Sequence, residues 1–118
     1  MVGGREMRKI LGIWCDALRA GVAGDGPDLS ARQMAILLTV YLRPPPHTVR
    51  GFAAELNISK PAVTRALDTM AKLGLIRRKR DQADGRNVLI QPTVRGSVYL
   101  SEFADSVGRA DRARGPAP

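Results

Sequence analysis

The sequence predicts a mainly α-helical fold with one small β-hairpin, and three observations support this class. Aromatic residues make up only 4% of the 118 residues, so the core must rest on aliphatic side chains, which favours packed helices. Apolar residues recur at helical spacing in several segments that Gly- and Pro-containing stretches separate. Residues 75–90 are different, because they form two short strand-like runs around an Asp84-Gly85 turn.

Spacing and capping signals predict two helices in the first third of the chain. A first helix is expected over residues 5–20, where the apolar residues at helical spacing are Ile10, Ile13, Trp14, Ala17 and Leu18. Ser30 is followed three residues later by Gln33, which is the spacing of a capping box. The helix that begins there is apolar on most sides, so we expect it at the centre of the core. Pro44-Pro45-Pro46 ends it.

Two further helices are predicted on either side of a short turn. Thr48 can cap a third helix that runs to about Leu56, and Asn57 suits a turn because it tolerates left-handed backbone angles. Ser59 can cap a fourth helix, with Pro61 in its first turn, where a missing N–H does no harm. The expected buried face of the fourth helix consists of apolar residues one turn apart, Val63, Leu67 and Met70.

A basic hairpin is predicted to follow the helix-ending Gly74. Its first strand is expected over residues 75–79, its loop over 81–86 and its returning strand over 88–90. The first strand leads into the densest basic run of the chain, Arg77–Arg80. Strand alternation sends the first and third of these four side chains to one face and the second and fourth, Arg78 and Arg80, to the other.

A last helix is expected to open at Thr93 and to have room for about four turns before Gly108. Residues 109–118 are small, polar and rich in Gly and Pro, so we expect a flexible tail there. The expected organisation is therefore a winged helix-turn-helix domain over residues 1–108, with an N-terminal and a C-terminal flanking helix.

Composition narrows the function. The formal net charge of +8 favours a polyanionic partner, either nucleic acid or an anionic membrane surface. The basic residues lie on a hairpin rather than along an apolar-backed helix, which disfavours a membrane role. Cys15 is the only cysteine, and we expect a buried or half-buried hydrophobe rather than a redox sensor.

No catalytic set is apparent, so an enzyme is not expected. His47 lies in a Pro-rich joint without a cysteine or carboxylate cluster, so no metal is expected, and no cofactor motif is present. Apolar runs are too short to span a bilayer and no signal-peptide core is present, so a cytoplasmic location is expected.

The fourth helix has the division of faces that DNA reading requires. With its apolar face turned inward, the outward residues are Lys60, Pro61, Thr64, Arg65 and Asp68. Arg65 can form a bidentate pair with a guanine edge, and Thr64 can touch a thymine methyl group or a phosphate. Lys60 and Ser59 lie at the helix start, where phosphate is favoured. Asp68 is expected to pair with Lys72, one turn further along the helix.

The wing adds a second contact. Arg86 at its tip can enter a narrow A·T-rich minor groove, while Asp84 is expected to orient a neighbouring arginine rather than to touch DNA. The full set of candidate DNA-binding residues is Thr48, Arg50, Ser59, Lys60, Pro61, Thr64, Arg65, Arg78, Arg80, Arg86 and Asn87.

Four stretches together resemble the multiple-antibiotic-resistance regulator (MarR) family: residues 56–65, 73–78, 81–88 and 93–96. The similarity covers roughly residues 30–100. It implies a bacterial transcription factor that binds a pseudo-palindromic operator as a homodimer. It also places Ser59, Thr64 and Arg65 on the reading helix and makes Asp84 and Arg86 the acid–arginine pair of the wing.

The resemblance further implies dimerisation through terminal helices. The candidate seam consists of Ile10, Ile13, Trp14, Ala17, Val98 and Phe103. A small-molecule effector is allowed by the resemblance, although no residue pattern in this chain supports one. The predicted function is sequence-specific binding of double-stranded DNA, with repression of a promoter. The alternative is a winged-helix protein-interaction or assembly module that binds DNA only weakly and nonspecifically.

Overall fold

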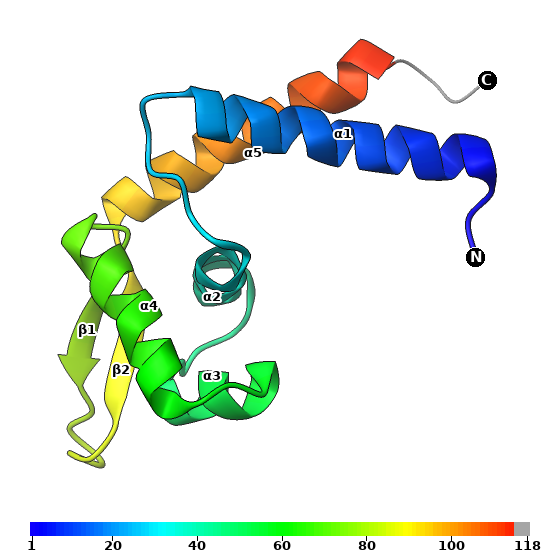
Figure 1. Cartoon of the computed structure of the whole chain (residues 1–118). Helices are drawn as coiled ribbons and strands as arrows, with labels where there is room; N and C mark the ends of the chain where they lie inside the picture. Colours follow the sequence, from blue (N-terminus) through cyan, green and yellow to red (C-terminus); the bar gives the residue numbers. More distant parts are fainter. Residues whose placement is uncertain (115–118) are drawn as a thin grey trace. The chain divides into compact units, whose positions relative to one another are not determined.

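The computed structural model describes residues 1–114, which form five helices and one antiparallel hairpin (Figure 1). The elements in chain order are α1 (Gly4–Ala23), α2 (Ala31–Leu42), α3 (Val49–Leu56), α4 (Lys60–Lys72), β1 (Ile76–Arg80), β2 (Val88–Pro92) and α5 (Val94–Arg114). The predicted class, mainly helical with a small hairpin, is confirmed.

The chain divides into two compact units. The single domain expected over residues 1–108 stays a prediction. One unit holds Met1–Asp28 and the chain from Tyr99 on, and the other holds Leu29–Val98. The second unit contains the helix-turn-helix and the hairpin. Within the first unit, α1 has its packing partners on α5, which explains why the two ends of the sequence belong together.

Side-chain caps fix the helix starts of the second unit. Ser30 Oγ accepts from the backbone N–H of Gln33 at 3.1 Å, and Gln33 Oε1 accepts from the N–H of Ser30 at 2.8 Å, so the predicted capping box is present. Thr48 Oγ1 accepts from Gly51 N at 3.0 Å and begins α3. These bonds satisfy N–H groups that a helix start otherwise leaves without a partner.

The turn between α3 and α4 also follows the prediction. Asn57 has a left-handed backbone, with φ at 54°, and Ser59 Oγ accepts from Ala62 N at 3.2 Å to begin α4. Gly74, with φ at 76°, lies just beyond the end of α4. The apolar face of α4 is buried in the second unit together with residues of α2, with the first residue of β1 and with Leu75 just before it. The buried side chains are Ile36, Leu37, Val63, Leu67, Met70, Leu75 and Ile76.

The first strand of the hairpin lies one residue later than predicted, at Ile76–Arg80, and the second begins at Val88 as predicted but ends two residues later, at Pro92. Its strands pair antiparallel with Arg78 opposite Ile90, and β1 packs against α4 (Figure 1). Ile76 and Ile90 are both buried, so this face of the ribbon is the core face. Because side chains alternate along a strand, Arg78 and Arg80 share that inner face and Arg77 lies on the other.

A hydrogen-bond junction holds both ends of the hairpin to α2. The Tyr41 hydroxyl lies within donor distance of two carbonyl oxygens, those of Leu75 at 2.7 Å and Thr93 at 3.1 Å, and it accepts from Thr93 N at 2.9 Å. Thr93 Oγ1 in turn donates to the Gly74 carbonyl at 2.6 Å and accepts from Gly96 N at 3.0 Å. The residues before β1 and after β2 are thus tied to one side chain of the core helix.

The last helix is longer than predicted, and the expectation that it ends before Gly108 is wrong. It continues to Arg114 because two ion pairs with α1 and the burial of Ala110 hold its final turns within the first unit. Arg114 Nη2 donates to Asp16 Oδ2 at 2.9 Å, Lys9 lies 4.0 Å from Asp111, and Ala110 is buried. Residues 109–114 of the predicted flexible tail are therefore helical, and the rest of that tail, residues 115–118, lies outside the described residues.

The first helix exposes an apolar stripe. It runs from Gly4 to Ala23, three residues beyond the predicted end. Its exposed apolar side chains recur every three or four residues and are 45–64% accessible: Met7, Ile10, Leu11, Trp14, Leu18 and Val22. Trp14 also makes an edge-to-face contact with Phe103, at 6.4 Å between ring centroids. Cys15 is exposed beside this stripe, so the prediction of a buried or half-buried cysteine is wrong.

None of the helices described in residues 1–114 combines the length and the apolar character that crossing a bilayer requires.

Gly96 supplies a test of the junction at Tyr41. A Cβ on this buried glycine would overlap the Tyr41 hydroxyl and the Leu75 carbonyl oxygen. We expect Gly96→Ala to cost about 1–3 kcal/mol of unfolding free energy through overpacking, measured by thermal denaturation followed by circular dichroism. The matched control is Ser97→Ala, one residue along the same helix and exposed, which should leave Tm within about one degree of wild type or raise it. Equal Tm values for the two variants would contradict the assigned role of the junction.

Candidate nucleic-acid interface

Helix α4 presents the predicted polar flank. Lys60, Pro61, Thr64 and Arg65 are exposed on it, while Val63 on the other side is completely buried. Ser59 is exposed at the helix start with its hydroxyl engaged as the cap. Since the apolar side of α4 is anchored in the core, the only side of this helix that can approach a groove is the one that carries Thr64 and Arg65.

The wing tip is built around a carboxylate. Asp84 Oδ1 accepts from the backbone N–H of Arg86 at 3.1 Å and from its Nε at 3.2 Å, so the expected acid–arginine pair is present. The Arg86 side chain remains 86% exposed. Arg80 Nη1 donates to the Gly85 carbonyl at 3.0 Å, which fastens the strand end to the loop. The wing therefore holds two arginines in defined positions while leaving one guanidinium open to a ligand.

Arginines keep the wing carboxylate ionised. Hydrogen bonds from the Arg86 side chain and backbone lower the pKa of Asp84 below its ordinary value of 3.8, and the charge of Arg50 adds to the effect. A depressed carboxyl pKa means that the ion pair persists above that value and is lost as the pH falls below it. Asp84 is therefore ionised, and able to pair with Arg86, across the neutral pH range.

Asp68 pairs with the wing instead of with its own helix. The sequence suggested Lys72 as its partner, but Asp68 Oδ1 lies 2.6 Å from Nη1 of Arg78 on β1. Packing of β1 on α4 brings the inner face of the strand to the helix, so Arg78 reaches Asp68 across the two elements. Arg78 is therefore paired with Asp68 and joins α4 to β1, and its expected contact with DNA stays a prediction.

The start of α3 adjoins the returning strand. Thr48 forms an isolated antiparallel bridge with Leu89, and the His47 carbonyl accepts from Ile90 N at 2.9 Å. Arg50, the second residue of α3, is exposed, and its charge helps to lower the pKa of Asp84. The backbone of Asn87 closes the wing loop, because its N–H donates to the Asp84 carbonyl at 3.0 Å. These residues thus belong to the same surface as the wing.

His47 has a structural environment. It is buried, its Nε2 donates to the Arg43 carbonyl at 3.1 Å, and its ring stacks on Phe52 with 5.9 Å between centroids. Within residues 1–114 no group of three or more His, Cys, Asp or Glu side chains is arranged to hold a metal ion.

Arg32 is not among the residues that the sequence predicts for this surface. The second residue of α2 lines a cleft of about 210 Å³ together with Arg65 and Thr69 of α4. The sequence does contain an indication of this role, since a base so close to the capping Ser30 interacts unfavourably with the helix dipole. Such a position suggests that the base binds an anion.

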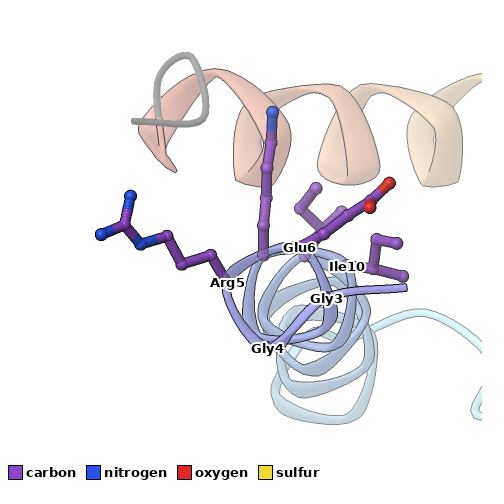
Figure 2. A pocket seen from close by; sticks show the side chains of 7 residues that line it. Gly3, Gly4, Arg5, Glu6 and Ile10 are labelled. Atoms are coloured by element: carbon purple, nitrogen blue, oxygen red, sulfur yellow. The ribbon is translucent and has the colours of Figure 1, made fainter. Parts of the chain in front are cut away.

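A larger and very open hollow runs along the first turns of α1. Its volume is about 610 Å³, and it is lined by Gly3, Gly4, Arg5, Glu6, Lys9, Ile10 and Ile13. Figure 2 shows Glu6 and Ile10 pointing to one side of the helix and Arg5 to the other. The polar groups do not converge on a common point, as they do in a ligand site.

Comparisons with known proteins identify a family that shares this sequence pattern. The model of the MarR family matches residues 28–87, which span α2, α3, α4, β1 and the whole wing loop. No curated protein matches the chain.

Solved structures share the fold at low sequence identity. The transcriptional regulator Tm0710 from Thermotoga maritima aligns with a TM-score of 0.74 and 19% identity, over 89% of this chain and 72% of its own. MarR itself aligns with a TM-score of 0.67 and 20% identity, over 93% and 79%. The S. aureus MepR–DNA complex aligns with a TM-score of 0.71 and 19% identity, over 92% and 84%. The family model covers half of the chain and includes the whole helix-turn-helix, so the chain belongs to the MarR family.

Proposed function

We propose that the protein is a DNA-binding transcriptional regulator that represses a promoter by occupying an operator in it. The observation that carries this proposal is the joint exposure of Thr64 and Arg65 on α4 and of Arg86 on the wing, within one unit of the chain. MepR, which shares this fold, has been solved bound to DNA. Family membership and the fold likeness support the same use of the helix and the wing here.

The proposed roles follow from position. The α4 side chains enter the major groove, where Arg65 forms a bidentate pair with a guanine and Thr64 contacts a neighbouring base or phosphate. Ser59, Lys60 and Pro61 lie at the end of α4 that meets the backbone. Thr48, Arg50, Arg80 and Asn87 belong to the surface around the wing, which follows the backbone to the minor groove where Arg86 inserts.

We further propose that the protein binds as a homodimer. The exposed stripe on α1 is a contiguous row of large apolar side chains, and such rows mark interaction surfaces. Of the predicted seam, Ile10, Trp14 and Val98 are exposed, and Phe103 contacts Trp14. Ala17 is only 1% accessible within its own unit, so it supports the stripe from beneath rather than meeting a partner.

Replacing Arg65 tests base reading. Binding sites would first be selected from random duplexes, and Arg65→Ala would then be titrated by fluorescence anisotropy against the selected site and against single-base variants of it. We expect a loss of about 1–3 kcal/mol and relaxed specificity at one base pair per half-site. Lys72→Ala, at the other end of α4, removes the same charge and should change neither quantity measurably.

Arg86→Ala provides the contrast, because a minor-groove contact should lower affinity for every duplex and lower it most for A·T-rich flanks. If Arg65→Ala instead weakened binding to all duplexes equally, Arg65 would be a phosphate contact. If the wild type bound no selected site and formed a stable complex with another protein, the protein-interaction alternative would replace the proposed function.

Replacing Leu11 tests the dimer surface. Leu11→Lys places a charge in the middle of the exposed stripe, whereas Ala20→Lys adds the same charge to the same helix at an exposed position off the stripe. By sedimentation equilibrium, we expect Leu11→Lys to raise the dimer dissociation constant at least tenfold and Ala20→Lys to leave it unchanged. A monomeric wild type, or equal effects of the two substitutions, would refute the assignment of this surface.

A further inference from the structure

The cleft between the start of α2 and the flank of α4 carries positive charge that no acidic residue offsets. Arg32 of α2 and Arg65 of α4 both line it, and both side chains are exposed. Within residues 1–114, neither arginine forms an ion pair with a carboxylate. No acidic residue lines the cleft. Two guanidinium groups that share a cleft without an anion repel each other, and a bound anion would remove that repulsion.

The polar neighbours of these arginines are already engaged. Ser30 and Gln33 bond each other's backbone in the capping box, and the Thr69 hydroxyl donates to the Arg65 carbonyl at 3.3 Å. The cleft, at about 210 Å³, exceeds the roughly 30 Å³ that one water occupies in the liquid. It therefore has room for a larger anion, and the arginines are the groups left to bind it.

The position of Arg32 supports the same conclusion by a separate route. Helix N-termini favour anionic side chains and disfavour cationic ones. Yet α2, α3 and α4 have no acidic residue in the first turn, and each has a base there: Arg32, Arg50 and Lys60. By contrast, the first turn of α1 contains both a base, Arg5, and an acid, Glu6.

Helix α5 also begins with a base, Arg95, but the stem of that side chain packs against Gly74 and so has a structural role. Three helix starts that carry a base and no acid in the first turn are the arrangement expected where a polyanion supplies negative charge.

We infer that Arg32 binds a backbone phosphate of the duplex at the cleft beside Arg65, as a third anchoring point outside the reading helix and the wing. This inference rests on the proposed function, since it assumes that a duplex lies along α4. A strand whose phosphate is held at Arg32 passes next to Arg65. Arg32 is therefore a positioning residue that carries no sequence information of its own.

A set of modified duplexes tests this inference. The full-length protein would be titrated against the selected site with a single neutral methylphosphonate placed at each phosphate in turn. Wild type should lose affinity at every phosphate it contacts. Arg32→Ala should bind the unmodified site roughly eightfold more weakly per subunit near 0.1 M salt, from the counterion release of one phosphate. It should also become insensitive to the methylphosphonate at one position per half-site, and the loss should be the same on scrambled duplexes.

Two further variants separate binding from folding. Arg43→Ala removes the same charge at the other end of α2 and should leave the methylphosphonate profile unchanged. Arg32→Glu restores the anion that a helix start prefers, so it should raise Tm while weakening DNA binding further.

The outcomes are distinguishable. A wild type that binds no duplex defeats the proposed function itself. If the wild type binds and the methylphosphonate profile of Arg32→Ala is identical to that of the wild type, only the inference about Arg32 is refuted. A loss confined to one sequence would make Arg32 a base reader, and unchanged DNA binding with loss of inorganic phosphate binding would make the cleft a small-anion site. Either of these results also overturns the inference.

Discussion

The orientation of the hairpin relative to the reading helix depends on the Tyr41 hydroxyl. This one group bonds the residues that precede β1 and follow β2, at Leu75 and Thr93, so both strand ends are fixed to the core helix α2. Gly96 allows the approach because any Cβ there would occupy the space of the hydroxyl. A second tie, between Asp68 and Arg78, joins α4 directly to β1, although an exposed pair of this kind contributes only about 0–1 kcal/mol. Helix and wing are therefore joined by side-chain contacts within one unit of the chain.

Acidic residues near this surface serve to hold arginines. Asp84 fixes Arg86 at the wing tip, and Asp68 fixes Arg78 at the junction of wing and helix. The helix starts of α2, α3 and α4 contain bases where isolated helices favour acids. A protein that kept these positions only for stability would have the opposite charges. The pattern is expected if these bases bind a polyanion. They then lower the stability of the free protein and raise its affinity for the polyanion.

Local chemistry explains why much of the second unit could be predicted from sequence. The capping box at Ser30, the left-handed turn at Asn57 and the helix end at Gly74 each depend on residues within three or four positions, and each appears as predicted. The hairpin turn and the outward placement of Thr64 and Arg65 follow from the same short-range signals.

The errors arise where distant residues decide. Asp68 prefers Arg78, ten positions away, over Lys72 one turn away because strand packing brings Arg78 within 2.6 Å. Residues up to Arg114 are helical because Asp16 and Lys9 on α1 hold the last turns, across nearly the whole sequence. Cys15 is exposed because only part of the surface of α1 is covered within its unit. The spacing of apolar residues in the sequence does not indicate which part is covered. The cleft at Arg32 needed α2 and α4 to be placed side by side.

We propose that the cationic surface formed by α4, the wing and the start of α2 binds duplex DNA mainly through phosphates. The most direct test is the salt dependence of binding, measured by anisotropy on the selected site over a range of monovalent salt concentrations. If each subunit of a dimer neutralises about four to five phosphates, the plot of log affinity against log salt should have a slope of roughly −7 to −9. A slope near zero, with affinity retained at high salt, would contradict the account.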